Sequence, residues 1–182
     1  MKLSEPVSRK HLHTRAITLH GYQREDGQFD IEDEITDTKA YAFNIGIREV
    51  KIGDPLHHMR ARLTVDENLT ITQAEAVTEA GPFTICPGGA ETFGRLTGLT
   101  IKSGFIKAAN ERLGGSVGCT HLRELLQQMA TVVFQTTFPM REKRVSDVQA
   151  ERPRLLNTCH AYADTGEVVK ERWPHLYKGE NS

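Results

Sequence analysis

The chain has 182 residues, of which 38% are hydrophobic and 26% charged, with a formal net charge of -1. This length and composition are typical of a globular protein that buries its own core. The near-neutral charge excludes a strongly basic nucleic-acid-binding surface, because phosphate binding requires an excess of Lys and Arg. No apolar stretch reaches the ~20 residues that span a bilayer, and residues 1–15 are too polar for a signal-peptide core. We therefore expect a cytoplasmic protein with no nucleic-acid or membrane partner.

The first half of the chain shows the alternating pattern of half-buried strands. Residues 12–20 and 29–36 are predicted to form one β-hairpin, and residues 56–65 and 69–77 a second. Residues 40–52, between the two hairpins, are expected to add a further strand. The predicted fold class is α+β, with an antiparallel β-meander in the N-terminal half.

The second strand, residues 29–36, is rich in acids. Its apolar side chains alternate with acidic ones, which predicts one buried and one solvated face. The acids in and around this strand are Asp26, Asp30, Glu32, Asp33, Glu34 and Asp37. We interpret this run as a solvated strand face, with a cation site as the alternative.

From residue 88 to 138 the hydrophobic period changes from two to about 3.6, which predicts helices packed on the sheet. The pattern indicates helices over residues 90–96, 104–113 and 120–138. The third has the clearest apolar stripe, formed by Leu122, Leu125, Leu126, Met129, Val133 and Phe134.

The C-terminal part begins with a charged, proline-punctuated connector at residues 139–154. Residues 155–177 regain apolar character and include Trp173, the single tryptophan of the chain. We expect this segment to return to the sheet and dock on it, so that residues 1–182 form a single domain.

The most suggestive chemistry is at residues 118–121, where a loop enters the third predicted helix. Unpaired backbone N–H groups and the positive end of the helix dipole favour a thiolate at Cys119. His121 reaches the same volume, either to bind a metal beside Cys119 or to accept its proton. Cys119 and His121 are therefore the candidate catalytic residues. The structural alternative is a buried cysteine followed by a solvent-facing histidine.

Other candidate metal ligands lie near turns. Cys86 precedes the first predicted helix, so two helix N-termini can converge, and His57 shares the apolar face of its strand. The candidate metal site, for zinc or iron, consists of Cys86, Cys119, His121, His57 and Asp54. A hydrogen-bonded core histidine and inert thiols are the alternative. An odd number of cysteines argues against a disulfide framework.

Gly115 and Gly118 are candidate ligand-binding positions. Glycine lets the backbone approach a ligand closely, and this loop can form an anion-binding nest. A plain helix cap is the alternative. A further thiol and imidazole pair, Cys159 and His160, joins the site if the C-terminal segment folds back over it.

Several stretches along nearly the whole chain resemble a bacterial family known as domain of unknown function 2889. They include His13-Thr14-Arg15, Pro55-Leu56-His57, Glu111 to Gly115, Gly118 to Leu122, Cys159-His160 and Arg172-Trp173-Pro174. A more distant similarity, over residues 53–130, is to the iron–sulfur scaffold and sulfur-acceptor (SufE/NifU-like) superfamily. That resemblance places Asp54, Cys86 and Cys119 at three site positions. Ile52 and Gly118 replace its remaining cysteine and histidine, so it implies a fold and a site location rather than cluster assembly.

Three functions remain open at this point. The first is a small lyase or hydrolase of bacterial carbon metabolism, with bound Zn²⁺ or Fe²⁺ as Lewis acid or Cys119 as nucleophile. The second is a non-catalytic carrier that delivers sulfur or metal to a partner protein. The third is a binding module for a small anionic metabolite. The sequence does not define the oligomeric state, and a homo-oligomer stays open.

Overall fold

The computed structural model describes residues 2–144 and 155–179. Contacts between residues divide the chain into two compact units, Met1–Thr137 and Phe138–Ser182. The docking of residues 155–177 on the sheet, and with it a single domain, stays a prediction.

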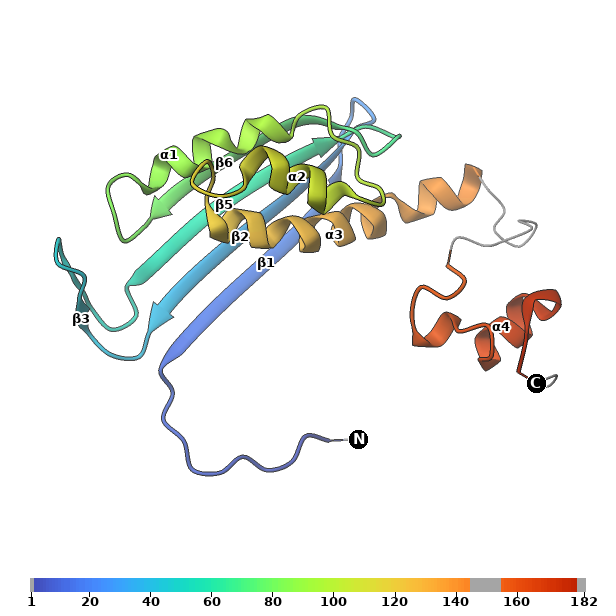
Figure 1. Ribbon diagram of the computed structural model, residues 1–182, viewed down its shortest axis with the longest axis horizontal. Helices are drawn as coiled ribbons and strands as arrows, with labels where there is room; N and C mark the ends of the chain where they lie inside the picture. The colour runs from blue at the N-terminus through green and yellow to red at the C-terminus, as the bar shows by residue number, and fades with distance from the viewer. Residues whose placement is uncertain (1, 145–154, 180–182) are drawn as a thin grey trace. The chain divides into compact units, whose positions relative to one another are not determined.

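The first unit is built on a four-stranded antiparallel sheet (Figure 1). Its strands are β1 (His13–Gln23), β2 (Phe29–Lys39), β5 (Pro55–Val65) and β6 (Ile71–Ala80). The order β1-β2-β5-β6 follows the chain, so the predicted β-meander and the α+β class are confirmed.

Strand β2 is longer than predicted and continues to Lys39. Burial alternates along it, with Phe29, Ile31 and Ile35 in the core. The same alternation buries Asp33 and Asp37, which are 3% and 1% exposed. The interpretation of the whole acidic run as a solvated face is therefore wrong for these two residues, because they share the parity of the apolar side chains.

The segment between β2 and β5 forms a small ribbon instead of a further strand of the main sheet. Its two strands, β3 (Phe43–Asn44) and β4 (Glu49–Val50), pair with each other. Gly46 lies between them with φ of 89°, a left-handed conformation that glycine adopts without a steric cost.

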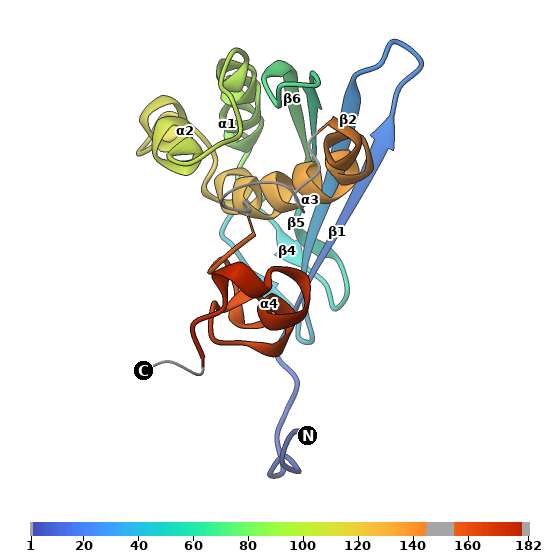
Figure 2. The same ribbon diagram turned by 90° about the vertical axis from the view of Figure 1, so that its right-hand side faces the viewer.

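Helices cover one face of the sheet, as both views show (Figures 1 and 2). They are α1 (Cys86–Glu91), the 3-10 helix η1 (Thr92–Leu96), α2 (Phe105–Leu113) and α3 (Thr120–Arg144). The first helical segment begins four residues before the predicted Ala90, at Cys86. It does so despite two glycines, because Gly89 packs against Cys119, where a Cβ would lie only 3.3 Å from the Cys119 Cβ.

Helix α3 buries the predicted apolar stripe from Leu122 to Val133, whereas Phe134 is partly exposed. The helix continues through Pro139 to Arg144 rather than ending at residue 138. Pro139 has no N–H to donate and its ring crowds the carbonyl of Gln135, so the helix lacks one hydrogen bond at this point. Thr136 of α3 lies directly over Gly21 of β1, where a Cβ would meet the threonine hydroxyl.

In the second unit, the described residues form α4 (Glu167–Arg172) between two 3-10 turns, η2 (His160–Tyr162) and η3 (Pro174–Leu176). Trp173 is fully buried and its ring packs against Tyr162. Among the residues that the structure describes, no helix has the length and apolar character of a membrane span.

Candidate metal centre

The candidate site lies at one end of the sheet. Antiparallel pairing places the starts of β1 and β5 beside the end of β2, and it sets Asp37 directly opposite His57. The N-terminus of α3 lies over the same end, because Cys119 Sγ contacts Met59 Sδ of β5 at 3.7 Å. Three elements that are distant in sequence therefore deliver side chains to one point.

Asp37 is the centre of this arrangement. Arg15 of β1 donates from Nε to Oδ1 and from Nη2 to Oδ2, both at 2.8 Å. His13 Nε2 lies 3.1 Å from Oδ1, and His57 Nδ1 lies 3.0 Å from Oδ2. The remaining Arg15 nitrogen, Nη1, donates to Glu124 of α3 at 2.9 Å. Both carboxylate oxygens are thus held by nitrogen groups from two neighbouring strands.

These partners determine the charge of Asp37. Burial acts to raise the pKa of the carboxyl group, but the hydrogen bonds and positive charge of Arg15, with the bond from His57, outweigh it and lower the pKa. Asp37 is therefore an anion in a buried position, paired as buried charges must be.

Two imidazole rings meet beside this anion. The ring centroids of His57 and His121 are 4.0 Å apart. Burial, and then the nearby charge of His121, lower the pKa of His57, which favours the neutral imidazole that binds metals. In the described part of the chain, Asp37, His57 and His121 form a group whose ligand atoms all lie within 4.8 Å of one another.

Cys119 joins this group through His121. Its carbonyl accepts the N–H of Arg123, so Cys119 is the N-cap residue of α3, and the predicted loop-to-helix junction is confirmed. The thiol Sγ lies 3.8 Å from Nδ1 of His121. The thiol of Cys119 thus lies beside His121, one member of the group that includes Asp37.

Comparison with known proteins places the chain in a family. The family model described as "Protein of unknown function (DUF2889)" matches residues 13–135. The chain belongs to this family. The matched region contains the whole cluster around Asp37, from His13 to His121, and ends before the second unit. No curated protein and no solved structure matched the chain.

Two of the predicted metal ligands, Cys86 and Asp54, lie outside the group formed by Asp37, His57 and His121. Cys86 packs against Gly81, where a Cβ would lie 3.2 Å from the Cys86 Sγ. Asp54 Oδ2 accepts the N–H of Lys51 at 3.2 Å and so closes a turn before β5. Both residues stand outside the group of mutually close ligand atoms, and their part in a metal site stays a prediction.

The backbone conformation and packing explain why residues 115 and 118 are glycines. Gly115 has φ of 63°, in the left-handed region that favours glycine. A Cβ at Gly118 would lie 2.7 Å from the Leu113 carbonyl oxygen, so only glycine fits there. Cys159 is exposed at the N-cap of η2 in the second unit. Ligand binding at the glycines and a role for Cys159 and His160 stay predictions.

Sequence reasoning named Asp37 only within an acidic run interpreted as a solvated face, with a cation site as the alternative, and it did not select His13 or Arg15. For Asp37 a signal existed: it lies an even number of positions from Phe29, Ile31 and Ile35, on the apolar face. The prediction that β2 ends at residue 36 left Asp37 in a loop. His13 and Arg15 share the parity of Ile17 and Leu19, but this signal is weaker, because β1 is exposed along most of its length.

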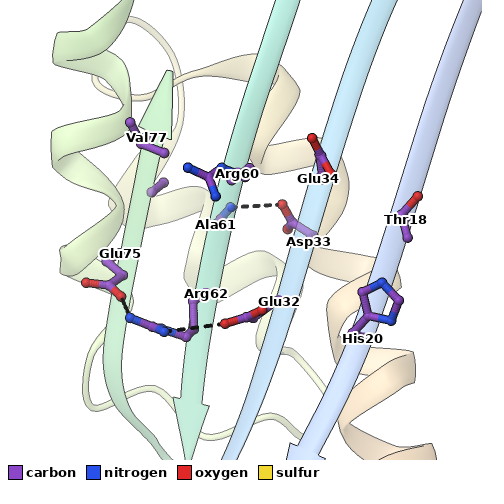
Figure 3. Close-up of a pocket in the computed structure, with 11 residues that line it drawn as sticks. Thr18, His20, Glu32, Asp33, Glu34, Arg60, Ala61, Arg62, Glu75 and Val77 are labelled. Carbon is purple, nitrogen blue, oxygen red and sulfur yellow. Dashed lines mark hydrogen bonds and ion pairs between the residues drawn. The ribbon is translucent and has the colours of Figure 1, made fainter. Parts of the chain in front are cut away.

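The open face of the sheet has a different chemistry (Figure 3). A pocket of about 450 Å³ lies over β2, β5 and β6 and is lined by charged side chains. Within it Arg62 pairs with both Glu32 and Glu75, so one positive charge is shared between two carboxylates. The group formed by Asp37, His57 and His121 lies on the opposite, helix-covered face.

Proposed function

We propose that the protein binds a divalent transition-metal ion, zinc or ferrous iron, between His57, His121 and Asp37. The observation that carries this proposal is the convergence of their ligand atoms within 4.8 Å. The 3.0 Å separation of His57 Nδ1 and Asp37 Oδ2 suits a shared ion as well as a hydrogen bond. Two ligands that each lie about 2.0–2.1 Å from one ion are themselves about 3 Å apart.

The donor set supports a reactive rather than a structural metal. Two imidazoles and one carboxylate are the ligands of catalytic zinc and of non-haem iron sites, which keep coordination positions open. Structural zinc instead has four protein ligands, usually with several thiolates. An ion with open positions acts as a Lewis acid on water or on a substrate oxygen, which supports a lyase or hydrolase.

The neighbours of Asp37 support the same proposal. Ligating carboxylates are usually fixed by further hydrogen bonds, and these fix the geometry of the metal ligands. Arg15 provides two such bonds and is itself held by Glu124. The carboxylate is therefore already oriented toward His57 before any ion binds, which lowers the cost of organising the site.

A thiol-based function is the second candidate, and the position of Cys119 favours it. The Cys119 thiol lies at a helix N-terminus, 3.8 Å from the His121 imidazole that can accept its proton. Such a thiol suits a nucleophile or a sulfur carrier. Metal binding requires His57, whereas a thiol function requires only Cys119 and its neighbour His121, so the two functions differ in their dependence on His57.

Metal titration of the purified protein tests the first proposal. The wild-type protein is expected to bind one equivalent of Zn²⁺ or Co²⁺. His57→Ala and His121→Ala are each expected to weaken binding at least tenfold, because each removes one of three ligands. His58→Ala is the matched control, since His58 is the next residue on β5 and pairs with Glu34 on the open face. Equal affinities for His57→Ala and His58→Ala would overturn the metal site.

Cobalt spectra separate the two candidates. With Asp37, His57 and His121 as ligands, the Co²⁺ protein is expected to show d–d bands without a thiolate-to-cobalt charge-transfer band. Such a band that disappears in Cys119→Ser would make Cys119 a ligand. A protein that binds no metal but whose Cys119 reacts with iodoacetamide faster than Cys86 would support the thiol function instead.

A further inference from the structure

The two edges of the main sheet are unlike each other. The edge of β6 is covered at its start, where Ile71 donates its N–H to the Leu99 carbonyl and accepts that of Gly98. Thr70 and Thr100 form an isolated bridge beside them. At the other edge, β1 pairs with β2 alone within the described part of the chain. Its eleven residues leave a row of backbone groups open to another strand.

The pairing with β2 identifies which groups face outward. Arg24 donates its N–H to Gln28, and Ala40 donates to Leu12, at the two ends of the hairpin. Hydrogen-bonded pairs alternate with non-hydrogen-bonded pairs in an antiparallel ladder, so even-numbered residues of β1 bond to β2. The N–H and C=O groups of the odd-numbered residues point away from the sheet.

Strand β1 has few of the features that protect an open edge. Proteins commonly guard such an edge with proline, lysine, a β-bulge or an inward-pointing charge. Strand β1 contains no proline and no lysine, and its register with β2 runs without a shift from His13 to Gln23. Its one inward-pointing charge, Arg15, lies near one end of the strand and is paired with Asp37.

We propose that β1 pairs antiparallel with β1 of a second copy of this chain, so that two sheets join into one of eight strands. A two-fold axis at Thr18 is the register that pairs all eleven residues. It brings the outward-facing odd residues into hydrogen-bonded pairs, with Ile17 opposite Leu19 of the second copy. Figure 3 shows Thr18 on the outermost strand of the sheet.

Charge favours a second copy as the occupant of this edge. The segment before β1 is basic, with Arg9 and Lys10. In the turn after β1, Asp26 is already paired with Arg24, so Glu25 gives the turn its net negative charge. A two-fold axis at Thr18 sets the basic segment of each copy beside this turn of the other, with Lys10 one position from Glu25 in the register. Within the paired strands, Arg15 faces Gly21, so no like charges oppose each other.

Site-specific crosslinking tests this register. At the axis, the two Thr18 residues form a non-hydrogen-bonded pair with Cα atoms about 4.5 Å apart, which suits a disulfide. Thr18→Cys is therefore expected to form a covalent dimer under mild oxidation. Thr14→Cys is the matched control, because Thr14 lies on the same face of β1 but opposite Tyr22. Both variants also carry Cys159→Ser, which removes an exposed thiol.

Light scattering on the unmodified protein completes the experiment. A mass of twice the 20.4 kDa chain, with selective crosslinking of Thr18→Cys, supports the proposal. A monomer at micromolar concentration overturns it. A dimer in which Thr18→Cys crosslinks no better than Thr14→Cys also overturns it, because the copies then meet elsewhere. None of these outcomes depends on metal binding.

Discussion

Strand β2 carries two buried aspartates four positions apart on the same face, and their surroundings differ. Asp37 has both oxygens bonded, to Arg15, His13 and His57. Asp33 accepts one bond, from the Ala61 N–H at 3.1 Å, and its Oδ2 has no partner among the described residues. Burial raises the pKa of Asp33 to about 7, while Asp37 has a pKa below its usual value.

The difference follows from the residue opposite each carboxylate. Asp33 faces Ala61 across the β2–β5 ladder, whereas Asp37 faces His57. Burial penalises both carboxylates as ions, and only Asp37 has cationic partners that offset this cost. One end of β2 therefore holds a fixed anion suited to a metal site, and the middle holds an acid close to its midpoint at neutral pH.

Removing the paired carboxylate is expected to cause the largest loss of stability. Asp37→Ala leaves Arg15 and His13 without their acceptor, and breaking a buried ion pair costs about 3–5 kcal/mol. The Arg15 side chain is 34% exposed and can hydrate, so we expect the lower end of that range. Urea unfolding measures the change. A loss below about 1 kcal/mol, typical of an exposed pair, would mean that Asp37 is not the centre of the network.

Removing the unpaired carboxylate of Asp33 is expected to raise the stability of the protein. In the unfolded chain an aspartate has a pKa of about 3.9, so between there and about 7 the folded state binds more protons at Asp33. Its contribution to stability therefore falls as the pH rises through this window. Asp33→Asn stays neutral and should be more stable than the wild type at pH 8, by up to about 4 kcal/mol.

Urea unfolding at pH 5 and pH 8 tests this prediction. The gain from Asp33→Asn should be larger at pH 8 than at pH 5. Glu91→Gln serves as the control, because Glu91 is an exposed acid of α1. If Asp33→Asn changed stability equally at both pH values, Asp33 would not titrate in this range.

The contrast between the two aspartates also marks what the sequence could predict. Period-two alternation gave the hairpins and the inward direction of His57, since both depend on local pattern. The same alternation places Asp33 and Asp37 on the apolar face of β2. The interpretation of all the acids as one solvated face overlooked this. Strand ends are the least certain part of such a pattern, and the end of β2 decided whether Asp37 lay in the sheet.

The site was predictable only in part for a physical reason. Cys119 and His121 are local to one helix start, so the sequence located them. Their meeting with His57 and Asp37 depends on how α3 crosses the sheet, which is a matter of tertiary packing. The length of the first helical segment also depended on packing, because Gly89 fits against Cys119 despite its low helix propensity.

The smallest expected effect on stability is that of replacing His58, a residue of β5, the strand that pairs with β2. His58 bonds to Glu34 at 2.6 Å, but the two side chains are 28% and 50% exposed. An exposed pair of this kind contributes about 0.2–1 kcal/mol. His57→Ala removes a partner of the buried Asp37, so its loss of stability should exceed that of His58→Ala by about 1 kcal/mol or more. Paired urea titrations of the two variants measure the difference, and equal losses would show that burial of Asp37 does not strengthen its bond to His57.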